Sequence, residues 1–336
     1  MCSVAVLASI ASAAVGEEEA TSGPACTSRP ASEIVLVRIG DEAVLTQAEF
    51  DREIRHIRPE WRPNLMGHVV ARLVEQKLLL LYVAEHPELV SEDALQAAYK
   101  QTMKEAKVDT LDALKASLQK KGTSWTEYRN RKIRMVAQNV LAGRGIEKGK
   151  DEALLKRMYD ANPQHWNGAS VTARHILLSV SLYATPAQRE AKRRHLARIR
   201  EDIVSGKRAW DECVQESDYN TKYAGGLIGD IPRYNRFNEA LASAVWDLKV
   251  GELSDIIEDH LGFQIVEATG RKPGYRDFSD RKTQFDMKSW LEKKFYRDAI
   301  EEMWRKHAIV GVQAPTLKPV AGPSSSPASR PAARAR

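Results

Sequence analysis

The hydrophobic periodicity of this 336-residue chain changes at residue 171, and this change constrains the fold more than any other feature. Before it, apolar residues between Leu65 and Leu81 recur three to five positions apart, which is typical of a largely buried amphipathic helix. Residues 171–180, VTARHILLSV, are short, apolar and rich in β-branched side chains, and they favour a strand buried on both faces. The chain must therefore combine a helical part with a part built on a sheet.

Residues 34–168 are expected to begin with a β-hairpin and to continue as helices. Two apolar runs joined across Gly40-Asp41 predict the hairpin. Thr46 with Glu49 three residues later has the pattern of a capping box, which would start a helix over 47–57. Helical spacing then predicts further helices over 65–81, 91–106, 109–121, 124–145 and 151–160.

The second half of the chain alternates between the two kinds of pattern. Residues 170–272 read as a strand, two helices, a glycine-rich loop at 225–229, a third helix and a strand at 262–268, which is an α+β order. Thr185 and Gln188 form a second capping-box pattern at the start of the first of these helices. Residues 278–308 return to helical spacing, and we expect them to pack on the helices of 64–145.

Four motifs in the order and intervals of residues 170–272 resemble the parvulin domain of peptidyl-prolyl cis–trans isomerases. They are 172–177 (TARHIL), the glycines at 225, 226 and 229, 251–254 (GELS) and 261–266 (LGFQIV). The resemblance implies an α+β fold with an antiparallel sheet and flanking helices, inserted in an all-α domain similar to the N-terminal domain of SurA- and PrsA-like foldase-chaperones. The implied segments are a signal and spacer (1–33), a hairpin-plus-helices domain (34–168), the parvulin domain (170–272), a returning helix (277–312) and a disordered basic tail (313–336).

The resemblance also implies a set of site residues. The catalytic positions are His175, Gln264, Ser217 and Asp218, and the substrate-binding positions are Ile228, Phe237, Leu241 and Tyr219. Three of the relevant positions depart from the family pattern: Gln264 stands where a second His is usual, Tyr219 where a Cys or Asp is usual, and Asp259 where a Thr often sits. Taken singly, His175, Phe237 and Leu241 are typical core residues, and Asp218 is a typical turn or cap residue.

Two functions follow from the resemblance. The first is an isomerase with chaperone activity that acts on unfolded or exported proline-containing polypeptides, without cofactor or metal. The alternative is a holdase chaperone whose parvulin domain binds peptides and has lost catalysis. For the isomerase we expect weak turnover, with Phe237→Ala more damaging than Gln264→Ala, because truncating a packed Phe costs about 3–5 kcal/mol and losing one hydrogen bond about 0.5–1.5 kcal/mol.

Composition bears on the location and partners of the chain. Residues 4–15 are apolar and small, as in a secretory signal, although no Lys or Arg precedes them. We therefore expect an extracytoplasmic protein, with the cytoplasm as the alternative. Three cysteines (Cys2, Cys26, Cys213) have neither disulfide-framework nor metal-site spacing.

The charge of the chain does not predict nucleic-acid binding. Residues 313–336 carry four basic and no acidic residues, which accounts for four of the six net positive charges. A Pro/Ala/Ser-rich basic end of this kind is more typical of a solvated tail than of a nucleic-acid arm. No apolar run reaches the roughly 18 residues of a membrane span. The resemblance implies unfolded or proline-containing polypeptides as partners. The sequence does not predict the oligomeric state.

Overall fold

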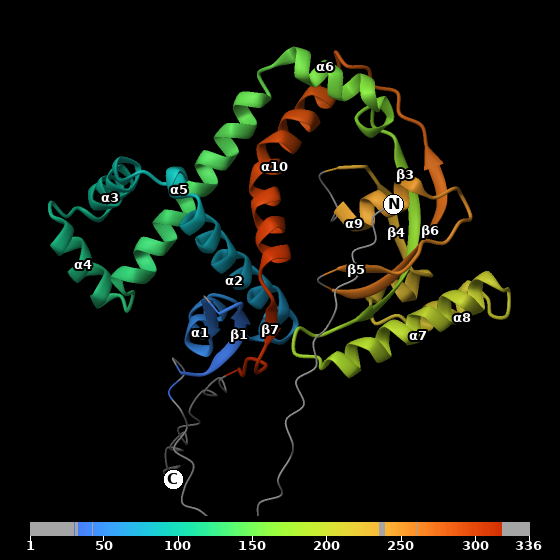
Figure 1. Ribbon diagram of the computed structural model, residues 1–336, viewed down its shortest axis with the longest axis horizontal. Helices are drawn as coiled ribbons and strands as arrows, with labels where there is room; N and C mark the ends of the chain where they lie inside the picture. Colours follow the sequence, from blue (N-terminus) through green and yellow to red (C-terminus); the bar gives the residue numbers. More distant parts are fainter. Residues whose placement is uncertain (1–29, 31–32, 42, 235–238, 260, 318–336) are drawn as a thin grey trace, which may run out of the picture.

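The computed structural model describes residues 30, 33–41, 43–234, 239–259 and 261–317, which form a helical frame beside a sheet unit (Figure 1). We use "frame" for the described residues up to 168 and from 274 onward, and "sheet unit" for the described residues between 170 and 272. Helix α6 lies where the chain passes from the frame to the sheet unit, and α10 starts near it on the way back (Figure 1).

The frame opens with a hairpin of β1 (Val35–Ile39) and β2 (Ala43–Thr46), which confirms the predicted hairpin. Thr46 and Glu49 form the predicted capping box, and α1 (Gln47–Ile54) follows. At the other end of the chain β7 (Ile309–Gly311) pairs antiparallel with β1, so the sheet order is β2-β1-β7. The segment 277–312 was expected to be a helix alone, and its last residues instead form this strand.

Five helices confirm the periodicity between residues 65 and 160. They are α2 (Arg62–Glu85), α3 (Glu92–Ala106), α4 (Leu111–Lys120), α5 (Trp125–Lys148) and α6 (Glu152–Ala161). Short 3₁₀ turns at Pro59–Trp61, Pro87–Leu89 and Pro163–His165 join them to their neighbours. Each turn starts with a proline, whose fixed φ suits a first helical position.

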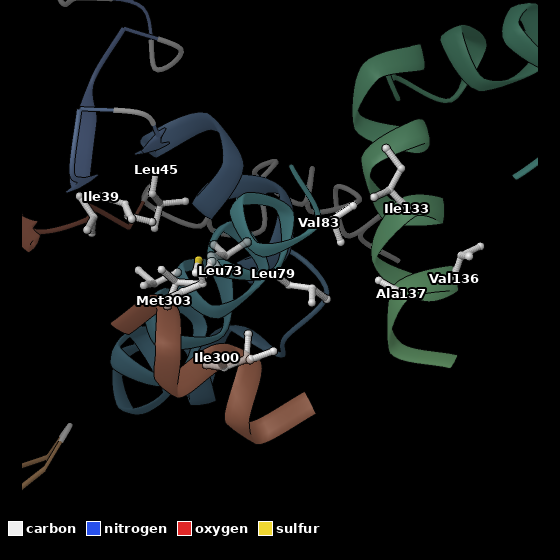
Figure 2. Packing of buried hydrophobic residues seen from close by; sticks show 14 of the residues in the cluster. Ile39, Leu45, Leu73, Leu79, Val83, Ile133, Val136, Ala137, Ile300 and Met303 are labelled. Carbon is white, nitrogen blue, oxygen red and sulfur yellow. The ribbon is translucent and has the colours of Figure 1, made fainter. Parts of the chain in front are cut away.

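Helix α10 (Arg281–Lys306) packs on α2 and α5, as predicted for residues 278–308. Met303 is fully buried in the core to which α2 contributes Leu79 (Figure 2). Phe295 packs against the same core, whereas Trp290 lies in a separate aromatic cluster near the sheet unit and Trp304 is 40% exposed. The frame is therefore discontinuous in sequence, with the sheet unit inserted between α6 and α10.

The sheet unit has the antiparallel strand order β4-β3-β6-β5. Its strands are β3 (Ser170–Ser179), β4 (Leu227–Ile231), β5 (Ile257–Asp259) and β6 (Gly262–Lys272). Its helices are α7 (Pro186–Val204), α8 (Trp210–Cys213) and α9 (Glu239–Asp247), with 3₁₀ turns at Val214–Glu216 and Asn220–Ala224. The Thr185–Gln188 capping box is confirmed, but the glycine segment 225–229, predicted as a loop, partly belongs to β4.

Each face of this sheet has its own core. Ile176 of β3 and Phe263 of β6 pack with residues of α7 and α8, whereas Ala173 and Val266 pack with residues of α9. The second half of β3 is buried on both faces, as its composition predicts. The alternation of the strands therefore directs odd-numbered β3 residues such as His175 towards the α9 side.

The two crossings between frame and sheet unit are held against each other. Backbone N–H groups of Tyr275 and Arg276 donate to the Asn167 carbonyl at 3.1 and 3.0 Å. The Arg276 guanidinium donates to the Trp166 carbonyl at 3.0 Å and pairs with Asp286 of α10 at 3.1 Å. The chain therefore leaves and re-enters the frame at one point.

Several sequence predictions fall outside the described residues: the signal segment, Cys2 and Cys26, Phe237, and the tail from residue 318. Residues 313–317 were expected to begin that tail, but they lie on the frame, where the Thr316 N–H donates to Gln47 Oε1 at 3.0 Å. Cys213 is a buried free thiol. Within the part of the chain that the structure describes, no helix is long and apolar enough to cross a bilayer.

The packing of α5 on α10 generates a stability prediction at Gly145. A Cβ built there would overlap the backbone carbonyl of Leu291, whereas one at Gly143, two residues earlier in α5, would meet nothing within 4 Å. We expect Gly145→Ala to lower the free energy of unfolding by about 1–3 kcal/mol, because overpacking strains the contact. Gly143→Ala, the matched control, should raise it by roughly 0.5–1 kcal/mol, because alanine favours the helix. Thermal or denaturant unfolding measures both, and a Gly145→Ala protein as stable as Gly143→Ala would contradict the close packing.

Candidate active site

His175 and Gln264, two of the catalytic positions that the resemblance implies, lie side by side on adjacent strands. The His175 Nδ1 and Gln264 Oε1 atoms are 3.1 Å apart, and both side chains are buried. In the β3–β6 ladder His175 is opposite Val266 and Leu177 is opposite Gln264, so the two side chains are diagonal neighbours on one face. The pair faces the same side of the sheet as α9.

Hydrogen bonds extend from this pair in both directions and fix the protonation of His175. Gln264 Nε2 donates to Asp259 Oδ2 at 2.6 Å, and a carboxylate can only accept, so Gln264 must present its carbonyl oxygen to His175. His175 Nδ1 therefore carries the proton. His175 Nε2, 2.8 Å from Thr221 Oγ1, then accepts from that hydroxyl.

Burial lowers the pKa of His175 below its usual value, and the nearby Gln264 and Asp259 oppose this in part. The imidazole is therefore neutral at pH 7, which agrees with its role as acceptor from Thr221. Asp259 keeps its position because its second oxygen accepts the Leu261 N–H at 2.8 Å in the turn between β5 and β6. Asp259, Gln264, His175 and Thr221 thus form one chain of hydrogen-bonded side chains, which we call the polar row.

Ser217 and Asp218, which the resemblance placed among the catalytic residues, serve the backbone of β3. The Ser217 hydroxyl accepts the Leu177 N–H at 3.1 Å and donates to the Leu177 carbonyl at 3.3 Å. Asp218 accepts from the Ser179 N–H at 2.9 Å and from Lys192 at 2.8 Å. These two residues therefore attach the loop to β3, and no hydrogen bond described here joins either of them to His175 or Gln264. Their catalytic assignment stays a prediction.

Sequence reasoning missed Thr221, which contacts His175 directly. Thr221 lies in the 3₁₀ turn Asn220–Ala224, and the available signal was a hydroxyl residue shortly before the Gly225-Gly226 pair. Gly226 has φ +82°, and a Cβ there would lie 2.5 Å from the His175 carbonyl oxygen. The glycine therefore permits the close approach that brings Thr221 to His175.

The predicted substrate-binding residues have different surroundings. The Tyr219 ring meets the His175 ring edge-on, with centroids 5.5 Å apart, and is half exposed, so it borders the site. Ile228 is partly buried against the core under α9, and Leu241 is buried within that core. Ile228 can therefore present apolar surface to a bound peptide, whereas Leu241 can only pack beneath that surface.

The described residues also bring together Glu85, His86 and Glu302 with metal-like spacing. These residues lie on the frame, and Lys306 forms an ion pair with Glu85 at 2.5 Å. The ammonium group already supplies the positive charge beside that carboxylate. We assign no metal to this cluster.

The hydrogen-bond row predicts one tautomer of His175. The Nδ1–H form should dominate near neutral pH, and the ring should titrate below about 6.5, because the folded state disfavours its charged form. As pH falls, the unfolded chain takes up this proton first, so His175 reduces the free energy of unfolding between the unfolded pKa and the lower folded one. Nitrogen-15 NMR of the imidazole measures both properties.

Asp259→Asn provides a control for the tautomer. An asparagine amide can face Gln264 either way, so both tautomers of His175 should then be populated. A dominant Nε2–H form in the unsubstituted protein would contradict the assigned row.

Comparisons with known proteins find relatives of the sheet unit and of the whole chain. Residues 175–270 match the family described as the PPIC-type PPIASE domain. Peptidyl-prolyl cis-trans isomerase Pin1 of Arabidopsis thaliana is 38% identical over 82 residues, which cover 24% of this chain and 68% of the relative. Chaperone SurA of Alkalilimnicola ehrlichii is 23% identical over 249 residues, which cover 69% of this chain and 56% of the relative.

A solved structure, peptidylprolyl isomerase PrsA of Bacillus anthracis, is 18% identical, and the match covers 70% of this chain and 96% of that one, with a TM-score of 0.39. The chain spans little more than half the length of the SurA relative that it matches. The match to the domain family includes His175, Thr221, Asp259 and Gln264. The chain belongs to the PPIC-type, or parvulin, family of peptidyl-prolyl cis–trans isomerases.

Proposed function

We propose that this protein is a peptidyl-prolyl cis–trans isomerase that acts on unfolded or exported polypeptides and also has chaperone activity. The observation that carries the proposal is the buried His175–Gln264 hydrogen bond inside the part of the chain that matches the parvulin family. The isomerase reaction requires no bond cleavage, so a neutral, partly apolar surface is chemically sufficient.

The energetic demand of the reaction suits this site. Rotating an X–Pro peptide bond crosses a barrier of roughly 18–20 kcal/mol, and a thousandfold acceleration requires a reduction of about 4 kcal/mol. Twisting removes amide resonance and weakens the carbonyl dipole, which a water-poor environment favours. Tyr219 and Ile228 supply apolar surface beside the neutral His175, and the buried row keeps that imidazole in one orientation.

Thr221 is the member of the row that lies towards the loop. Its hydroxyl donates to His175 Nε2 and keeps acceptor capacity for a second hydrogen bond. A peptide N–H entering beside Tyr219 can use that capacity. Thr221 therefore joins His175 and Gln264 as a proposed site residue, while Asp259 positions Gln264.

The chaperone part of the proposal rests on the frame. The match to Chaperone SurA extends over 69% of the chain, well beyond the sheet unit. The frame also exposes large apolar side chains, among them Trp61 and Phe285 at 56% and 63%. Such side chains can contact unfolded segments transiently, so we propose proline-containing polypeptides as clients.

A holdase without catalysis is the second candidate, and one observation favours it. Ser217 and Asp218 are engaged by the β3 backbone, so fewer polar groups remain for the reaction than the family pattern implies. Gln264 also cannot change protonation state. In this case the site would bind proline peptides without accelerating rotation about the X–Pro bond.

An assay of the full chain with proline peptides distinguishes the two candidates. We expect weak turnover in the unsubstituted protein, and a roughly two- to tenfold loss in Thr221→Val, because one hydrogen bond to His175 disappears while the shape is kept. Thr221→Ser should retain most of the activity. Peptide binding without turnover, together with turnover gained in Gln264→His, would instead establish the holdase.

We also propose an extracytoplasmic location, supported by the apolar, small-residue pattern of residues 4–15. Mass spectrometry of the mature N-terminus from native cells should find cleavage shortly after Ala14. A mature protein that retains residues 1–15 would contradict this location signal.

A further inference from the structure

An aromatic cluster joins the returning helix of the frame to the sheet unit. Trp290 of α10 lies 5.3 Å, centroid to centroid, from Tyr234, which follows β4. Tyr234 also stacks on Trp166 of the first crossing at 4.5 Å, with 29° between the ring planes. Trp166 in turn meets Trp290 edge-on at 5.9 Å. Tyr234 is thus in contact with two tryptophans that both belong to the frame.

Further ring contacts connect this aromatic cluster to the core on the α9 side of the sheet. His165 meets Tyr234 edge-on at 5.7 Å and Trp246 of α9 edge-on at 5.2 Å. Trp246 Nε1 donates to the Ile231 carbonyl at the end of β4, at 3.2 Å. Trp246 packs in the same core as Ile228 and Leu241. Contacts therefore run without interruption from α10 to the α9 side of the sheet, which is the side of His175 and Gln264.

Charged groups restrict Tyr234 further. Arg233 lies over the Tyr234 ring at 4.6 Å and forms an ion pair with Glu239 at the start of α9. The arginine therefore connects the tyrosine to the helix that covers the site. Because β4 and α9 both end on this cluster, their separation depends on where Tyr234 is held.

We propose that Trp290 is a positioning residue of the isomerase: by holding Tyr234, it sets the β4–α9 wall against which a bound peptide packs. The inference rests on the proposed isomerase function of that site. It assigns the frame a part in substrate binding that the sheet unit cannot supply, because Trp290 comes from α10. Replacing the ring should loosen the wall and leave the polar row of His175 in place.

The test compares Trp290→Ala with two matched variants in the full chain. Stacking of this kind predicts a roughly three- to tenfold increase in KM for a proline peptide in Trp290→Ala, with a smaller change in kcat. Trp290→Phe retains an aromatic ring and should restore a KM within about twofold of the unsubstituted value. Trp304→Ala, an exposed tryptophan elsewhere on α10, should change neither parameter.

Amide hydrogen exchange supplies a readout that does not depend on turnover. Exchange should accelerate in β4 and α9 in Trp290→Ala and remain unchanged in α7, which packs on the other face of the sheet. Tyr234→Leu should give the same pattern, which covers the case in which Trp290→Ala does not fold.

The two hypotheses fail in different ways. Absence of turnover in the unsubstituted protein would contradict the isomerase function, while the exchange comparison would still decide the coupling. A folded Trp290→Ala protein with unchanged β4 and α9 exchange would overturn the positioning role. Equal effects of Trp290→Ala and Trp304→Ala on KM would overturn it as well.

Discussion

The antiparallel pairing of β3 with β6, from Ser170 to Ser179, is the interaction on which the site depends. It sets the diagonal between His175 and Gln264, and a slip of one residue would turn one of the two side chains to the opposite face. Both faces of the pair carry apolar side chains, Ile176 on one and Val266 on the other. The cores on the two sides therefore hold the register, and the polar row inherits its geometry from them.

The same pairing explains how polar groups are tolerated in a buried position. His175, Gln264 and Asp259 each meet a partner of matching hydrogen-bond character, so none is left unsatisfied along the row. Where the family often has a threonine beside a second histidine, this chain has a carboxylate beside an amide. The two departures compensate each other, because the acceptor-only carboxylate orients the amide.

Local patterns predicted the parts of the fold that depend on local physics. The capping boxes at Thr46 and Thr185 and the helices between residues 65 and 160 were predictable because side-chain oxygens and apolar spacing act within a few residues. The family resemblance named His175 and Gln264 among the catalytic positions, and the two side chains lie in contact.

Features that depend on distant partners were not predictable in this way. Strand β7 is three residues long and exists because β1 lies beside it. Thr221 reaches His175 because Gly226 lets the loop approach β3. The hydrogen bonds of Ser217 and Asp218 to the β3 backbone also join residues far apart in the sequence, so composition could not predict them.

The pairing of β7 with β1 has a consequence for the order of events during biosynthesis. β1 emerges from the ribosome first, but its edge stays uncovered until Ile309–Gly311 has been translated. The sheet unit, by contrast, draws its strands from within 170–272, and its shorter-range contacts can form while α10 is still being made. Because the chain is made from its N-terminus, residues 170–272 can fold before β7 pairs with β1. The parvulin part of the nascent chain is then folded while the frame is still incomplete.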